Sequence, residues 1–205
     1  MSAPVRVKVC GVTRLEDALR AADAGADAIG LNFWEGSKRR CGLEVAAQIV
    51  SRLPPFVTPV AVFVNPTLAF VRSALDETGI SVAQLHGDED PETFSASVSQ
   101  LIKAVRVAGP QWRADADRYA RHTLLLDTAS AGFGGSGSTF DWSLVRDAPP
   151  ARPWILAGGL NAQNVAEAIR ALRPAAVDVA SGVESAPGIK DQTLLTRFIR
   201  AAKEA

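Results

Sequence analysis

Two side chains able to carry protons, Cys10 and Asp127, each stand where a short apolar run ends. A thiolate can act as a general base, and a carboxyl group can act as a general acid or base. A free thiol with a pKa of about 8.5 is mostly un-ionised at neutral pH, so Cys10 needs a cation nearby, and Lys8 is a candidate. The structural alternatives are a buried, unreactive cysteine and an aspartate that caps a helix or anchors a loop.

Two short pairs containing glycine, Gly158-Gly159 and Ser181-Gly182, follow two of the later apolar runs. Glycine lets backbone N–H groups approach an anion closely, and the dipole of a following helix favours the anion's charge. Either pair alone is also explained by an ordinary tight turn. Together, at the ends of two neighbouring strands, they favour a phosphate-binding site.

Two further residues follow apolar runs and are candidates for contacting a substrate. Arg39 lies in the basic stretch Lys38–Arg40, and its guanidinium can bind a carboxylate through two parallel hydrogen bonds. Such a stretch can equally be a solvated loop. His86 follows Gln84-Leu85 and either contacts a substrate or orders a loop. With two histidines in the chain, and Cys41 without a partner at metal-ligand spacing, we expect no metal site.

Apolar runs alternate with helical patterns along the whole chain, without a linker or a change in composition. The pattern predicts strands over residues 5–10, 26–33, 58–64, 82–85, 101–107, 123–127, 154–157 and 176–179. It predicts helices over 15–24, 43–53, 66–78, from 91 onward, 111–120, 140–146, 161–172 and 193–203. Eight such units predict an α/β fold, a closed (β/α)8 TIM barrel, as one domain over residues 1–205. The alternative is an open doubly wound sheet, which usually has fewer strands and a glycine-rich first turn.

Local signals add detail to this barrel. Thr13, with Glu16 three residues on, is expected to cap the first helix, and Asn161 the seventh. Strand alternation turns Lys8 and Asp178 inward on neighbouring strands, so we predict that they form a buried ion pair. The glycine-rich residues 129–138 suit a mobile lid, or else a plain flexible crossover.

The composition excludes several classes of partner. Twenty-two basic and 22 acidic residues cancel, so no basic surface favours nucleic acid or an anionic membrane. No apolar run approaches the ~20 residues of a membrane span, and Met1–Pro4 lacks the apolar segment of a signal peptide. Two cysteines do not make a disulfide framework. We therefore expect a cytoplasmic protein with free thiols and a small-molecule substrate.

Taken together, these residues resemble the phosphoribosylanthranilate isomerase family of tryptophan biosynthesis. The resemblance spans nearly the whole chain, and its motifs follow one another in order. The matching stretches are Lys8-Val9-Cys10-Gly11-Val12-Thr13, Ala26-Asp27-Ala28-Ile29-Gly30, Gln84-Leu85-His86-Gly87, Leu126-Asp127-Thr128, Gly134-Gly135-Ser136-Gly137, Phe140-Asp141-Trp142, Gly158-Gly159-Leu160-Asn161 and Val177-Asp178-Val179-Ala180-Ser181-Gly182-Val183-Glu184.

The resemblance implies an Amadori rearrangement of N-(5-phosphoribosyl)anthranilate to its 1-deoxyribulose phosphate product. Cys10 would be the general base, Asp127 the general acid, and Arg39 the residue that binds the anthranilate carboxylate. Such a proton transfer requires no cofactor. The chain departs from the family at Trp34-Glu35-Gly36, where a proline is usual, and at Arg40, where an aromatic residue is common. The carboxylate-binding role is therefore open between Arg39 and Arg40.

Other readings remain. The enzyme alternative is another phosphosugar isomerase, and the non-enzyme alternative is a phospholigand-binding barrel without catalysis. A pentose-phosphate epimerase would ordinarily carry metal-binding histidines, and an indole-glycerol-phosphate synthase would need a lysine at a strand end, whereas Lys8 lies deeper in its strand. The sequence leaves open whether the protein is a monomer or a homodimer, and whether a second aminoaldose is accepted.

Overall fold

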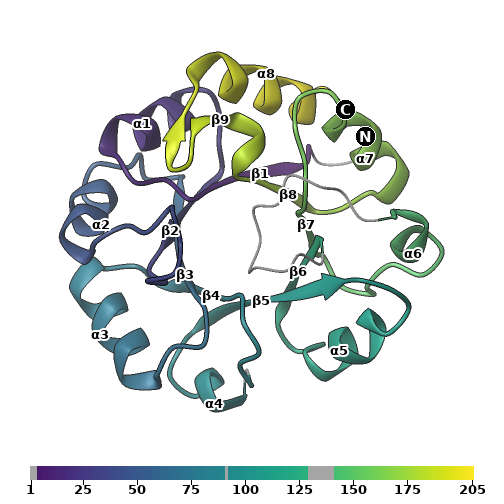
Figure 1. Ribbon diagram of the computed structural model, residues 1–205, viewed down its shortest axis with the longest axis horizontal. Helices are drawn as coiled ribbons and strands as arrows, with labels where there is room; N and C mark the ends of the chain where they lie inside the picture. Colours follow the sequence, from purple (N-terminus) through teal and green to yellow (C-terminus); the bar gives the residue numbers. More distant parts are fainter. Residues whose placement is uncertain (1–3, 91, 129–140) are drawn as a thin grey trace.

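The chain forms a closed barrel whose eight parallel strands follow one another in sequence order. The computed structural model describes residues 4–90, 92–128 and 141–205. The strands are β1 (Arg6–Cys10), β2 (Ala28–Asn32), β3 (Thr58–Phe63), β4 (Val82–Leu85), β5 (Gln100–Val107), β6 (Thr123–Thr128), β7 (Ile155–Leu156) and β8 (Ala176–Val179). Figure 1 shows them as an inner ring, with β1 beside both β2 and β8. The predicted TIM barrel is confirmed, and the open sheet is excluded.

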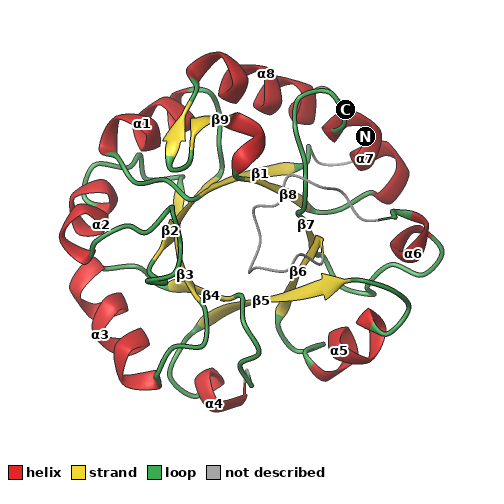
Figure 2. Cartoon of the chain, viewed as in Figure 1, coloured by secondary structure: helices red, strands yellow, loops and turns green. Residues whose placement is uncertain are grey.

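Helices surround the strands on the outside (Figure 2). Over the described ranges they are α1 (Leu15–Asp23), α2 (Leu43–Val50), α3 (Leu68–Thr78), α4 (Glu92–Ser95), α5 (Trp112–Arg118), α6 (Ser143–Arg146), α7 (Val165–Leu172) and α8 (Gln192–Lys203). No helix in this part of the chain is long and apolar enough to cross a membrane.

Alternation along the strands divides the apolar residues into two layers. One face of each strand packs under the helices in a large outer core that includes Val7, Val9 and Leu126. The other face fills the barrel interior with a smaller cluster: Val60, Val62, Val82, Ile102, Ala104, Leu125, Ile155 and Ala157. Leu125 faces inward, which sets the inward direction for Asp127, two residues further along β6.

Lys8 and Asp178 form the predicted ion pair inside the barrel. They are register partners on β1 and β8, and Lys8 Nζ lies 2.8 Å from Asp178 Oδ1. Both side chains are more than nine-tenths buried, at 3% and 9% exposed. Burial disfavours the ammonium form, but charge interactions and hydrogen bonds with Asp178 and Cys10 together outweigh that effect and hold the pKa of Lys8 above its usual value.

Removing one member of this pair is expected to be costly, because it leaves a buried charge without a partner. Asp178→Ala should lower the free energy of unfolding by about 3–5 kcal/mol, measured by urea denaturation. The double variant Lys8→Met/Asp178→Leu should recover most of that loss. Glu204→Ala, which breaks an exposed pair with Arg200, is the matched control and should have little effect. A loss for Asp178→Ala no larger than the control's would contradict the prediction.

Two predicted helix caps are wrong. Helix α1 begins at Leu15 after Arg14, and Thr13 instead donates a hydrogen bond of 2.7 Å to the carbonyl of Gly188. Asn161 closes a turn by accepting the backbone N–H of Gln163 at 2.9 Å, and α7 begins only at Val165. In both places a tertiary or turn contact takes the side chain that a local pattern assigns to a cap.

A short hairpin between β8 and α8 was not predicted. After a 3-10 turn at Ser181–Val183, strands β9 (Glu184–Ala186) and β10 (Ile189–Lys190) pair in antiparallel fashion. In Figure 1 the hairpin lies between α1 and α8, and Lys190 on β10 links it to Cys10 at the end of β1. It brings residues from the C-terminal quarter of the chain to the end of the first strand.

Candidate active site

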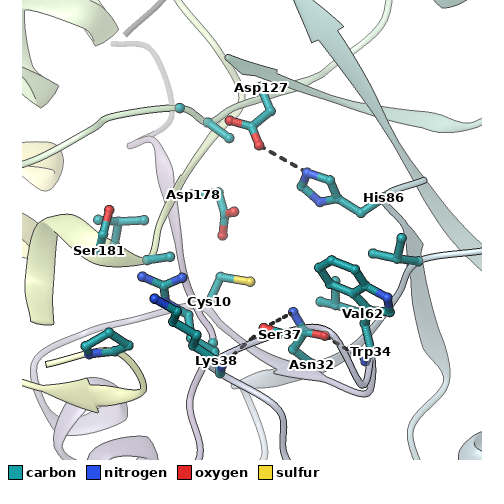
Figure 3. Close-up of a pocket in the computed structure, with 18 of the residues that line it drawn as sticks. Cys10, Asn32, Trp34, Ser37, Lys38, Val62, His86, Asp127, Asp178 and Ser181 are labelled. Atoms are coloured by element: carbon teal, nitrogen blue, oxygen red, sulfur yellow. Dashed lines mark hydrogen bonds and ion pairs between the residues drawn. The ribbon is translucent and has the colours of Figure 1, made fainter. Parts of the chain in front are cut away.

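A cavity of about 420 Å³ opens at the carboxyl ends of the barrel strands. Its wall includes the last residues of three strands, Cys10, Asn32 and Val179, together with residues from the loops that follow. Figure 3 shows the Cys10 sulfur and the Asp127 carboxylate facing this space. The loops at this end of a TIM barrel are where its chemistry usually takes place.

Cys10 is half-buried on the inner face of β1, where Gly30 on β2 makes room for its sulfur. A Cβ atom at Gly30 would lie 2.8 Å from Cys10 Sγ. Burial raises the pKa of the thiol, while the positive charges of Lys8 and Lys190 act to lower it. The cation predicted from the sequence is therefore present, but it does not outweigh desolvation, and sequence reasoning missed the second cation.

The carboxylate of Asp127 belongs to a hydrogen-bonded network that also includes His86 and Gln84. Its Oδ1 accepts the backbone N–H of Thr128 at 2.7 Å, and its Oδ2 lies 3.1 Å from His86 Nε2 (Figure 3). Gln84 Nε2 lies 2.8 Å from His86 Nδ1. Because an amide nitrogen only donates, this arrangement makes Nδ1 the acceptor and directs the Nε2 hydrogen at Asp127.

From the sequence, His86 was expected either to contact a substrate or to order a loop. In the structure it lines the cavity and lies within hydrogen-bond distance of Asp127. Gln84 was not recognised as a site residue. The available signal was its position two residues before His86 along β4, which puts it on the inward face of that strand.

Arg39 and Arg40, the two candidates for binding a carboxylate, lie in different surroundings. Arg39 lines the cavity, and its guanidinium forms a bidentate contact with Glu184. Arg40 is mostly exposed, and its Nη2 lies 3.5 Å from Oε1 of Glu35. Only Arg39 of the two lines the cavity, and sequence reasoning missed its partner Glu184.

The two glycine-containing loops lie against each other at one side of the cavity. Gly158, Gly159 and Ser181 line it. Gly182 does not; it packs behind, where a Cβ atom would overlap the carbonyl oxygen of Leu160. Gly158 has a positive φ of 87°, and a Cβ atom there would lie 3.0 Å from Asp127 Oδ1. Glycine at these positions therefore lets both loops and the carboxylate approach one another.

The chain's other histidine and other cysteine, which were not candidates for the site, do not line this cavity. His122 lines a second cavity of about 280 Å³ near α5, away from these residues. Cys41 is buried, which raises its pKa to about 11. Over the described ranges, no group of three or more His, Cys, Asp or Glu side chains is arranged to hold a metal. The predicted lid, residues 129–138, lies outside the described residues.

The chain matches the family model described as N-(5'phosphoribosyl)anthranilate (PRA) isomerase over residues 7–201. It is 51% identical over 204 residues to the N-(5'-phosphoribosyl)anthranilate isomerase of Myxococcus xanthus, covering 97% of this chain and 96% of that protein. The crystal structure of phosphoribosyl anthranilate isomerase from Thermotoga maritima superposes with a TM-score of 0.91 and 44% identity, covering 98% of this chain and 100% of that one.

A second solved structure is a phosphoribosyl anthranilate isomerase in complex with reduced 1-(o-carboxyphenylamino)-1-deoxyribulose 5-phosphate. It is 42% identical, has a TM-score of 0.87, and covers 98% of this chain and 100% of that one. A third similar structure is of monomers generated from the dimeric Thermotoga maritima protein. The family model spans nearly the whole chain, and the alignments with the relatives cover almost the full length of each relative. The chain therefore belongs to the N-(5'-phosphoribosyl)anthranilate isomerase family.

Proposed function

We propose that this enzyme converts N-(5'-phosphoribosyl)anthranilate to 1-(2-carboxyphenylamino)-1-deoxyribulose 5-phosphate, with Cys10 as the general base and Asp127 as the general acid. The observation that carries the proposal is that a thiol and a carboxyl group from β1 and β6 line one cavity. Arg39 and the two glycine-containing loops line the same space and suit the carboxylate and the phosphate of such a substrate.

The reaction begins with opening of the ribose ring. Asp127 donates a proton to the ring oxygen as the C1–O bond breaks, and the anthranilate nitrogen supplies the electron pair that forms an imine at C1. His86, within hydrogen-bond distance of Asp127, orients the carboxyl group. The cationic imine makes the C2 hydrogen acidic.

The thiolate of Cys10 then removes the proton from C2. The C–H electron pair forms a C1=C2 double bond, and the imine electrons return to nitrogen, giving an enolamine. In the ketonisation step C1 gains a proton and the C2 hydroxyl loses one, which leaves a ketone at C2. Over the cycle the proton held by Cys10 is released and the proton given by Asp127 is replaced. C1 is thereby reduced and C2 oxidised within one molecule, so atoms and electrons balance without an added reagent.

The phosphate of the substrate is assigned to the loops that carry Gly158-Gly159 and Ser181-Gly182. Binding there uses a remote part of the substrate to hold C1 and C2 between the acid and the base. The close approach of Gly182 to Leu160 is what allows the two loops to share one anion.

Gly182→Ala is expected to separate these loops, because its Cβ atom would overlap the Leu160 carbonyl. We expect kcat/KM to fall by about 10²-fold, mostly through KM, in steady-state assays. Gly42→Ala is the control, because its φ is −71° and nothing lies within 4 Å of a Cβ atom there. Unchanged KM in Gly182→Ala would argue against a phosphate site at these loops.

Turnover tests the function itself. The fluorescence of N-(5'-phosphoribosyl)anthranilate, generated in the cuvette, should decay when the wild-type protein is added. Binding without turnover would favour the phospholigand-binding barrel. Turnover of an unrelated phosphosugar in place of this substrate would favour another isomerase.

A further inference from the structure

The guanidinium of Arg39 is held along one edge by a single carboxylate. Its Nε lies 2.9 and 3.1 Å from Oε1 and Oε2 of Glu184, and its Nη2 lies 2.8 Å from Oε2. A guanidinium carries five N–H donors in one plane, and these contacts engage the Nε edge. The Nη1 end belongs to the same rigid plane, so its direction follows from the contact with Glu184.

Glu184 is itself held in place from other directions. Its side chain is 4% exposed, and its Oε1 also accepts hydrogen bonds from Lys190 Nζ at 2.8 Å and from the backbone N–H of Gly188 at 3.2 Å. The two cations outweigh burial and hold the pKa of Glu184 below its usual value, so the group is a carboxylate. A carboxylate held on several sides is a rigid support for Arg39.

Lys190 connects this support to the strand ends. Its fully buried ammonium group donates to the carbonyl oxygens of Cys10, at 2.6 Å, and Ala180, at 3.2 Å. Lys190 lies on β10, so the unpredicted hairpin fastens Glu184 to the ends of β1 and β8. With two cations around one carboxylate, the cluster retains a net positive charge that attracts another anion.

The aliphatic part of Arg39 is also confined. It lies on the backbone of Gly11, where a Cβ atom would approach Arg39 Cδ to 2.5 Å and Arg39 Cβ to 3.1 Å. Gly11 has a φ of +69°, which favours glycine. The side chain is therefore fixed by Gly11 along its stem and by Glu184 at its end, while it lines the cavity.

We propose that Glu184 is a positioning residue that directs Arg39 at the carboxylate of the substrate's aromatic ring, and thereby selects aminoaldose phosphates that carry this carboxylate. The inference rests on the proposed function. Glu184 does not contact the substrate; it acts through Arg39. Its replacement should therefore weaken the recognition of one substrate group and leave the recognition of the phosphate and the sugar unchanged.

The test compares two competitive inhibitors. One is reduced 1-(2-carboxyphenylamino)-1-deoxyribulose 5-phosphate, and the other is the same compound without the ring carboxylate. Glu184→Gln should raise the inhibition constant of the first by about tenfold or more and leave that of the second unchanged. Glu35→Gln is the matched control, because Glu35 is 86% exposed and pairs with Arg40.

A double-mutant cycle separates positioning from a general structural role. In an Arg39→Met background, which should itself abolish the preference for the carboxylated inhibitor, Glu184→Gln should add no further effect. Where Glu184→Gln fails to fold by circular dichroism, Glu184→Asp keeps the charge beside Lys190 but shortens its reach to Arg39, and should change the same ratio in the same direction.

Equal weakening of both inhibitors, or no change in either, would overturn the positioning role. The inhibitor comparison measures binding and does not depend on turnover. If the wild-type protein does not turn over the substrate, the proposed function is contradicted. If the ratio of the two inhibition constants is the same in the Glu184 variants as in the wild type, only this inference is contradicted.

Discussion

Cys10→Ser is expected to lower kcat by about 10³-fold while KM changes little. A serine hydroxyl fits the space that Gly30 leaves for the sulfur, so the fold and the binding groups should be retained. The hydroxyl is far less acidic than a thiol and does not supply a base for the C2 proton. The loss should therefore appear in the chemical step rather than in binding.

The fluorescence assay at saturating substrate measures the loss of kcat. Isotopic labelling tests whether removal of the C2 proton is the step that limits the rate. With deuterium at C2 of the substrate, the wild-type enzyme should show a primary isotope effect if proton removal limits the rate. Cys41→Ser is the matched control, because Cys41 is buried outside the cavity and should tolerate the change without loss of kcat. A Cys10→Ser enzyme that retains more than about a tenth of wild-type kcat would exclude Cys10 as the base.

The second large effect is expected for Asp127→Asn. Asparagine keeps the size of the side chain, and its oxygen can still accept the Thr128 N–H, but it has no proton to give to the ring oxygen. We expect kcat to fall by about 10²- to 10⁴-fold. Asp147→Asn, an exposed change at the C-cap of α6, serves as the control.

The residual activity of Asp127→Asn should also depend on pH in a defined direction. Burial raises the pKa of Cys10, so the thiol is largely protonated near neutrality. Once the acid is absent, the rate should follow the thiolate fraction, rising about tenfold per pH unit until the raised pKa is reached. A residual rate that falls with rising pH would contradict the assignment of Cys10 as the base.

Some features of the site were readable because strands alternate strictly. The inward positions of Lys8 and Asp178, and their pairing across β1 and β8, follow from the two-residue period and from barrel closure. The bounds of β8 were predicted as observed, Ala176–Val179, since a short buried run leaves little freedom. The same two-residue period places Asp127 on the face of β6 that also carries the inward-facing Leu125.

Other features depended on contacts between distant segments. The bidentate contact between Arg39 and Glu184 joins residues that are 145 positions apart in the sequence. The hydrogen bond from Thr13 to Gly188 spans 175 positions. No local period specifies such contacts. They arise because the hairpin of β9 and β10 is placed over the end of β1 once the barrel has closed.

The sequence by itself determined the barrel, the inward faces of β1 and β8, and the placing of a thiol and a carboxyl group at the ends of β1 and β6, because hydrophobic period and chain order are local properties. The tertiary structure alone decided which charges surround Cys10, which of two arginines enters the cavity, and what holds that arginine. Desolvation and hydrogen-bond partnership depend on every segment that packs around a group, and that environment exists only after the chain has folded.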